Sequence, residues 1–201
     1  SLVEQYGRSA LDCVDVDQHR GVERVVARLL ELGHERIGFF TWRYPVEASW
    51  ALRRFGAFVE VMTARGKRIH RTDLINVNPA HHCDLAASYQ WLLKQTKDGV
   101  TAWICAADHQ AFDLIPVLER AGYRVPQDVS LTGFDGLASP AGQPELTTVQ
   151  IPFHEIGVTG GKRLLELTHK RFGSEQHILL NCDLREGASV AKPRKLRKSR
   201  K

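Results

Sequence analysis

The stretch that decides the fold is VPQDVSLTGFD, at Val125–Asp135. Its apolar run, Val129–Phe134, has the length of a short buried strand and ends at an acidic residue, Asp135. A Gly- and Pro-rich loop, Gly136–Pro144, follows directly, as is typical of a segment leaving a sheet. On both sides of this stretch, the sequence contains further short apolar runs that predict strands.

Short apolar runs alternate with helical stripes along most of the chain. The runs expected to form strands are Ile37–Thr41, Leu74–Val77, Ala102–Ala106, Val129–Phe134 and His177–Leu180. Apolar residues at helical spacing predict five helices, with stripes at Val22–Leu30, Ala51–Met62, Leu85–Leu93, Ala111–Leu118 and Ile156–Leu167. This alternation favours parallel βαβ units, so the predicted fold class is α/β, a parallel sheet with helices on both faces.

The fourth helical stripe contains a proline. Pro116 would remove a backbone hydrogen bond inside a helix, at a cost of about 3 kcal/mol or more. We therefore expect either a kink at Pro116 or a helix that begins later than the stripe indicates. Just upstream, Asp108 is expected to cap the helix N-terminus, because a short acidic side chain accepts hydrogen bonds from the first free N–H groups.

The positive charge of the chain is concentrated at one end. Of 201 residues, 43% are hydrophobic and 25% charged, an ordinary globular balance, and the formal charge is +5. Residues 192–201 hold seven of the 28 Lys and Arg residues, and the other 21 are outnumbered by 23 acidic residues. The body is therefore not expected to bind nucleic acid. The tail, 191–201, is expected to be disordered, with contact to DNA phosphates as the alternative.

Several classes of protein are disfavoured by what the sequence lacks. The four cysteines form no CxxC pair, which favours free thiols in a reducing, cytoplasmic compartment. No apolar run approaches the ~18 residues of a membrane-spanning helix, so no membrane partner is expected. His81-His82-Cys83 lacks metal-site spacing, and P-loop, GxSxG and HExxH motifs are missing. We expect no metal, no cofactor and no catalytic residue; the chain is predicted not to be an enzyme.

Three segments resemble the LacI/GalR family of bacterial transcription regulators. They are ELGHERI at 31–37, VPQDVSLTGFD at Val125–Asp135 and LTTV at Leu146–Val149, and their spacing also fits. The resemblance implies a periplasmic-binding-protein-like sensor of two α/β lobes joined by three crossings. Residues 17–150 plus 179–190 would form the C-terminal lobe. Residues 1–16 plus 151–178 would form a remnant of the N-terminal lobe, which is expected to be incomplete.

The resemblance also implies a function. The chain would sense a small-molecule effector, expected to be a saccharide, in the cleft between the lobes and thereby modulate DNA binding by a homodimer. Nothing in the sequence resembles the family's helix-turn-helix, so DNA is expected to be bound through an N-terminal domain missing from this chain. Two alternatives share the design: a periplasmic solute-binding protein, and a LacI-like sensor fused to another DNA-binding module.

Two residues are the main candidates for effector binding. In parallel sheets, ligands bind outside the carboxyl ends of the strands. The resemblance assigns Arg54 and Asp135 to the effector, and the chemistry suits a polyol: a guanidinium offers five donors, and a carboxylate accepts from two neighbouring hydroxyls. Taken alone, Arg54 is a solvated helix arginine, as Arg53 beside it is expected to be, and Asp135 is a turn aspartate.

Four further residues complete the candidate ligand site: Asp108, Phe153, Trp42 and Asn78. Asp108 follows a strand, but Ala107 before it lacks the polar group that the family often has there. Phe153 and Trp42 offer aromatic faces that stack on sugar C–H groups, and core or hinge packing is the equal alternative. For Trp50, packing is the favoured interpretation. Asn78 sits where some relatives place an aromatic side chain over the effector.

Overall fold

The computed structural model describes residues 12–42, 49–76, 84–169 and 175–194. Its strands are β1 (Cys13–Val16), β2 (Ile37–Phe40), β3 (Leu74–Ile75), β4 (Ala102–Cys105), β5 (Ser130–Asp135), β6 (Thr147–Gln150), β7 (His177–Leu180) and β8 (Asp183–Arg185). Its helices are α1 (Gln18–Glu31), α2 (Ser49–Ala64), α3 (Leu85–Lys97), α4 (Asp108–Arg120) and α5 (Phe153–His169), with a 3-10 turn, η1 (Arg71–Asp73). The chain thus alternates between strands and helices as predicted.

The larger sheet has six strands in the order β3-β2-β4-β5-β6-β8. All neighbouring pairs are parallel except β6 and β8, which run antiparallel. The parallel strands therefore end at one common edge, and β5 ends there with Asp135 opposite Gln150 of β6. This edge is where a ligand crevice is expected in an open α/β sheet.

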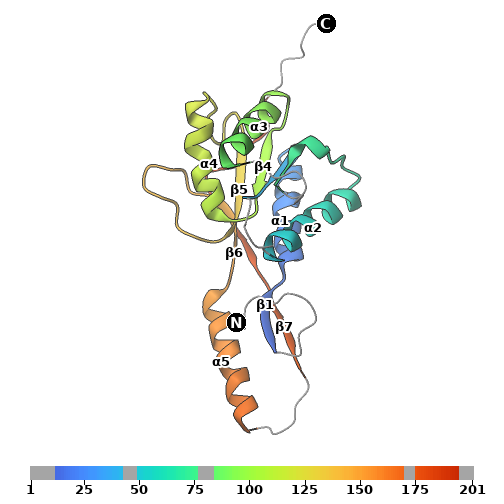
Figure 1. Ribbon diagram of the computed structural model, residues 1–201, viewed down its shortest axis with the longest axis vertical. Coiled ribbons are helices and arrows are strands. Elements are labelled where there is room, and N and C mark those ends of the chain that lie inside the picture. Colours follow the sequence, from blue (N-terminus) through green and yellow to red (C-terminus); the bar gives the residue numbers. More distant parts are fainter. Residues whose placement is uncertain (1–11, 43–48, 77–83, 170–174, 195–201) are drawn as a thin grey trace, which may run out of the picture.

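Helices cover both faces of this sheet, which confirms the predicted α/β class. One buried cluster joins α1 and α2 to Phe39 and Ile104, and the other joins α3 and α4 to Phe40 and Cys105. Successive side chains on β2 and on β4 thus enter opposite layers, as the two-residue period of a strand requires. Figure 1 shows α1 and α2 on one side of the sheet and α3 and α4 on the other.

A second, two-stranded sheet lies beyond the six-stranded one. β1 and β7 pair in parallel, with Cys13 opposite His177, and α5 packs beside β1. Figure 1 shows this part extending along the long axis of the molecule, away from the larger sheet. Leu164 and Leu165 of α5 are 56% and 64% exposed, so much of the apolar surface of this helix is uncovered. The assignment of these parts to two lobes stays a prediction.

Helix α1 packs very closely against the sheet. It begins where the Asp17 side chain accepts a hydrogen bond from the backbone N–H of Arg20, at 2.9 Å. A Cβ at Gly21 would lie 2.8 Å from Val149 and 2.9 Å from the Phe134 ring, so only glycine allows this approach. The close contact places the start of α1 next to the ends of β5 and β6.

The start of α4 differs from the expectation. The helix begins at Asp108 and continues through Pro116 to Arg120, so a later start is wrong. Ala107 is the N-cap residue, without a side-chain capping bond, and Asp108 is therefore not the cap. Proline at position 116 cannot donate to the carbonyl of Phe112, four residues earlier. The Gln143 side chain donates to that carbonyl instead, at 3.0 Å.

The limits of four strands differ from the predicted runs, and β2 and β4 each end one residue earlier than predicted. β3 contains only Leu74 and Ile75, because Asn76 adopts a positive φ of 59° that ends the extended backbone. Its side chain donates to the Thr41 carbonyl and to the Ser88 hydroxyl, which holds this turn against β2 and α3. β5 begins one residue later than predicted and includes Asp135.

Candidate ligand-binding site

Arg54 lies on the inner face of α2, at the edge where the parallel strands end. It is only 5% exposed, which excludes the solvated-helix interpretation. Its Nε donates to the Gln18 side chain at 3.1 Å, and one terminal nitrogen donates to the Ala106 carbonyl at 2.6 Å. The guanidinium plane lies over the Phe134 ring at 3.8 Å and the Trp50 ring at 4.7 Å. These contacts fix the orientation of the guanidinium before any ligand binds.

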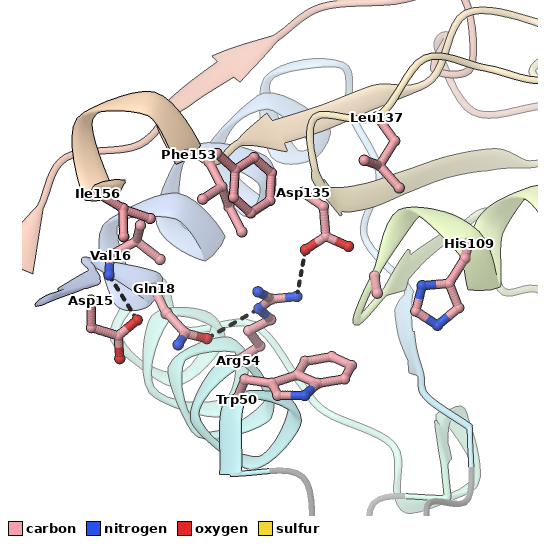
Figure 2. A pocket seen from close by; sticks show the side chains of 12 residues that line it. Asp15, Val16, Gln18, Trp50, Arg54, His109, Asp135, Leu137, Phe153 and Ile156 are labelled. Atoms are coloured by element: carbon pink, nitrogen blue, oxygen red, sulfur yellow. Dashed lines mark hydrogen bonds and ion pairs between the residues drawn. The ribbon is translucent and has the colours of Figure 1, made fainter. Parts of the chain in front are cut away.

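Asp135 faces Arg54 from the end of β5. The terminal nitrogen of Arg54 that bonds Ala106 also contacts the Asp135 carboxylate at 3.3 Å (Figure 2). The pKa of Asp135 is raised to about 6, chiefly by burial and also by the nearby Asp108, whereas Arg54 acts to lower it. Asp135 also has a φ of 142°, a backbone conformation that costs free energy in a non-glycine residue. Such strain is typical of functional sites.

The two side chains line a cavity of about 330 Å³. Its wall comprises Asp15, Val16, Gln18, Trp50, Arg54, Ala107, His109, Asp135, Leu137, Ile151, Phe153 and Ile156. These residues come from β1, from the starts of α1, α4 and α5, from α2, and from β5 and the segments just after β5 and β6, so the cavity lies where the two parts of the molecule meet (Figure 2). A few polar groups in a mainly apolar wall are typical of small-molecule sites.

The structure brings three of the six candidate residues into this wall. Arg54, Asp135 and Phe153 line the cavity, and Phe153 is 58% exposed at the first turn of α5. Asp108 and Trp42 are not among the lining residues. Asn78 lies outside the described residues.

Asp108 is a buried support for the cavity wall. It is fully buried, and its carboxylate accepts hydrogen bonds from the Thr148 hydroxyl and from the backbone N–H of Leu137, at 2.7 Å. Burial raises the pKa of Asp108, while these two hydrogen bonds act to lower it. Because Leu137 lines the cavity, Asp108 acts on the site by holding the loop that follows β5.

Trp42 lies behind His109, which does line the cavity. The two rings meet edge to face with centroids 4.7 Å apart. Burial lowers the pKa of His109 below its ordinary value of 6.5, so the imidazole is neutral at pH 7. Trp42 thus orients a neutral hydrogen-bonding ring rather than lining the cavity.

Sequence reasoning missed Asp15, Gln18 and His109, whereas Arg53 is exposed on α2 as expected. Arg53 forms an ion pair with Asp15, whose side chain is only 8% exposed. A signal for Asp15 existed in the sequence: it is a lone carboxylate between Val14 and Val16, and a buried charge needs a partner. Trp50 packs against the core cluster as expected, and it also lies over Arg54 and lines the cavity.

The described ranges hold no cluster of metal-binding side chains and no helix suited to crossing a membrane. No three His, Cys, Asp or Glu side chains in them converge as a metal site requires, and His81–Cys83 lie outside these ranges. Within the same part of the chain, no helix is both long and apolar enough to cross a membrane.

Comparison with known proteins decides the family. Residues 26–190 match the family of periplasmic binding protein-like domains. The chain belongs to this family. The match includes Arg54, Asp135 and all strands from β2 to β8.

The relatives that the chain resembles are transcription regulators. It is 25% identical over 178 residues to the arabinose metabolism transcriptional repressor of Geobacillus stearothermophilus, covering 83% of this chain and 46% of that protein. It is 29% identical over 174 residues to the repressor PurR of Photobacterium profundum, covering 86% and 51%. The resemblance to the LacI/GalR family is thereby confirmed, and the chain spans about half the length of these curated relatives.

A solved structure supports the same assignment. The LacI family transcriptional regulator of Enterococcus faecalis V583, with bound ribose, superposes with a TM-score of 0.74 at 25% identity. The match covers 96% of this chain and 68% of that one. The periplasmic-binding-protein-like fold of the described residues is therefore that of LacI-type effector-binding domains.

Proposed function

We propose that this chain is the effector-binding part of a LacI/GalR-type transcription regulator and binds a sugar in the cavity at Arg54 and Asp135. Membership of the family and the regulator relatives support this assignment. Because the chain spans about half of those relatives, binding of operator DNA, assembly as a homodimer and a cytoplasmic location belong to the proposal as well.

The observation that carries the proposal is the buried ion pair between Arg54 and Asp135 at the cavity wall. Its partners are held by Gln18, by Ala106 and by the strained end of β5, so the pair is fixed in place. A guanidinium beside a carboxylate presents donors and acceptors together, which suits the adjacent hydroxyl groups of a sugar. The aromatic face of Phe153 is available for the apolar face of the same ligand.

The position of the cavity suggests how binding is transmitted. The wall combines Asp15 of β1 and Phe153 of α5 with Arg54 and Asp135 of the larger part. A ligand that contacts residues of both parts favours the relative position of the two parts in which all these contacts form. It shifts the equilibrium only by the difference between its affinities for the alternative arrangements.

Calorimetric titration tests the proposal directly. The full chain is titrated with D-ribose, L-arabinose, D-glucose and cellobiose, and Arg54→Ala is compared with the wild type. We expect at least one sugar to bind, and Arg54→Ala to weaken that binding by about tenfold or more, since a hydrogen bond from a charged group contributes about 1.5–3 kcal/mol.

The matched control is Arg124→Ala. Arg124 pairs with Asp128 on the surface and does not line the cavity, so its loss should leave the affinity unchanged. Circular dichroism establishes that each variant folds. Sugar binding that is equally strong in Arg54→Ala and wild type would remove Arg54 from the site, and no binding of any sugar would overturn the proposal.

A further inference from the structure

Two consecutive arginines of α2 each pair with a carboxylate from a different strand. Arg53 pairs with Asp15 of β1, and Arg54 pairs with Asp135 of β5. Both carboxylates line the same cavity, and Figure 2 shows them on opposite sides of the Arg54 side chain. The pair of Arg53 with Asp15 is separate from the pair that carries the function proposed above.

The Asp15 carboxylate is held in a fixed orientation. One oxygen accepts from the backbone N–H of Val16 at 2.8 Å, and the other accepts from the Arg53 guanidinium. The other three residues of β1 are Cys13, Val14 and Val16, all buried and apolar. A buried charge in such an apolar strand costs free energy unless it has a partner. The pairing of Asp15 with Arg53 therefore offsets a cost that an apolar residue at position 15 would not have, and packing of β1 alone does not explain it.

The charges at the cavity balance. Two carboxylates face two guanidinium groups, and His109 is neutral at pH 7 because burial lowers its pKa. An anionic ligand would therefore have to compete with Asp15 or Asp135 for an arginine that is already paired. A ligand with hydroxyl donors finds acceptor oxygens at two separated places and displaces no ion pair.

We infer that Asp15, oriented by Arg53, is a second ligand-binding carboxylate and makes the cavity select an uncharged polyhydroxyl ligand over its anionic counterpart. This inference rests on the proposed function, because it concerns the ligand of the same cavity. Asp15 accepts from hydroxyl groups at one end of the ligand while Asp135 accepts at the other. Arg53 is a positioning residue that also neutralises Asp15.

The test compares matched neutral and anionic sugars. The full chain is titrated calorimetrically with D-ribose and D-ribose 5-phosphate, and with D-glucose and D-glucuronate. For the wild type we expect a neutral sugar to bind about tenfold or more tightly than its anionic partner, since unfavourable charge placement changes affinity by at least that factor.

Two variants should change the selectivity in opposite directions. Asp15→Asn removes a charged acceptor and leaves Arg53 without its carboxylate, so the neutral sugar should bind about tenfold more weakly and the anionic sugar more tightly. Arg53→Gln leaves the Asp15 charge uncompensated, so the anionic sugar should bind more weakly still. Asp183→Asn is the matched control, because it breaks an ion pair with Arg24 outside the cavity and should change neither affinity.

The outcomes separate this inference from the proposed function. If Asp15→Asn weakens both members of a sugar pair equally, Asp15 is a structural residue and the inference fails. If the wild type binds the anionic sugar more tightly, the inference also fails, but ligand binding at the cavity stands. If neither neutral nor anionic sugars bind the wild type, both the proposed function and the inference are overturned.

Discussion

At the scale of single residues, Asp135 ends β5 in a strained backbone conformation and places an acidic group in the cavity wall. Burial raises its pKa to about 6, above the ordinary value of 3.8, although Arg54 is adjacent. The charged groups that face it are Arg54 and Asp108, and the neutral ring of His109 lines the same cavity. Between about pH 4 and pH 6 the folded protein therefore binds more protons at this site than the unfolded chain does.

This pKa predicts how sugar binding depends on pH. Below about pH 6, Asp135 becomes protonated and loses the charge that pairs with Arg54 and accepts ligand hydroxyls. We expect the dissociation constant of a bound sugar to rise as the pH is lowered from 7 to 5, measured by calorimetry. Asp135→Asn should bind weakly with a much flatter pH profile; an equally steep profile in this variant would assign the titration to another group.

The same shift has a predictable sign for stability. Since the raised pKa belongs to the folded state, the free energy of unfolding falls as Asp135 ionises, from about pH 4 upward to about pH 6. Above pH 6 the whole penalty is present, and below about pH 4 it is absent. Urea unfolding at a series of pH values, with Asp135→Asn as the reference, should show this contribution as a difference between the two profiles.

Gly133 of β5 allows a test of how closely this strand packs against Asp108 of α4. A Cβ at Gly133 would meet the Asp108 carboxylate, would lie 2.7 Å from Leu146 and would approach the Asp108 backbone at 3.1 Å. We expect Gly133→Ala to destabilise the protein by about 1–3 kcal/mol, the usual cost of overpacking, as measured by urea unfolding. Gly56→Ala is the control: nothing lies within 4 Å of that Cβ, and alanine should stabilise the exposed helix position by up to about 1 kcal/mol.

At the scale of elements, α4 includes a proline because another segment satisfies the backbone group that the proline leaves free. Gln143, in the loop before β6, donates to the Phe112 carbonyl at 3.0 Å. That loop also contains Leu137, which is held by Asp108 through its N–H and by Arg185 of β8 through its carbonyl. The loop that borders the cavity is thus fixed by α4 and by β8.

A double-mutant cycle tests the role of Gln143. We expect Gln143→Ala to cost about 1 kcal/mol, the net contribution of one hydrogen bond, because it leaves the Phe112 carbonyl without a donor. In a Pro116→Ala background the cost should be smaller, since alanine supplies the missing helical N–H. Unfolding free energies of the four proteins give the coupling, and additive effects would mean that the two residues do not serve the same carbonyl.

Helix α1 is tied to the returning end of the chain by a row of side-chain contacts. Arg20, Arg24 and Arg28, one helical turn apart, contact Asn181, Asp183 and Glu186 respectively. These contacts are exposed, so each contributes little stability on its own. Their regular spacing keeps residues 181–186 alongside the helix, where the chain passes from the small sheet to the large one.

At the scale of the whole molecule, the cavity lies between two sheets that also share one buried hydrophobic cluster, which includes Val14 and Val16 of β1. Asp15 belongs to the two-stranded sheet, yet its ion pair reaches α2, which covers the six-stranded sheet. A ligand in this position therefore stabilises the arrangement of both parts together. Its effect is measurable as a change in global stability.

Ligand binding should raise the free energy of unfolding by an amount that grows with the logarithm of the ligand concentration above the dissociation constant. At a sugar concentration 100 times the dissociation constant, we expect an increase of about 2.7 kcal/mol in the wild type. Urea unfolding with and without the sugar measures this, and Arg54→Ala should show a much smaller increase at the same concentration. An equal increase in the variant would place the binding outside the cavity.

The fold class follows from the sequence because it depends on local and repeated features, and three of the six candidate residues, Arg54, Asp135 and Phe153, line the cavity. The alternation of apolar runs and helical stripes predicts the α/β sheet. Arg54 and Asp135 were predicted for the cavity because the family resemblance assigns them to the effector, and they line it in the structure. The limits of β3 and the start of α4 were less predictable, since Asn76 and Ala107 act there through local backbone conformation.

Only the tertiary structure decided which residues far apart in the sequence pair with one another. Asp15 and Arg53 are 38 positions apart, and Phe112 and Gln143 are 31 apart, so no local pattern relates them. Asp108 is a fully buried support and not an exposed cap, because β6 and the loop at Leu137 bring donors to its carboxylate. Local spacing determines which face of an element is apolar. The partner of each buried charge is set by which elements meet when the sheet and its helices pack, and the sequence alone does not contain those distances.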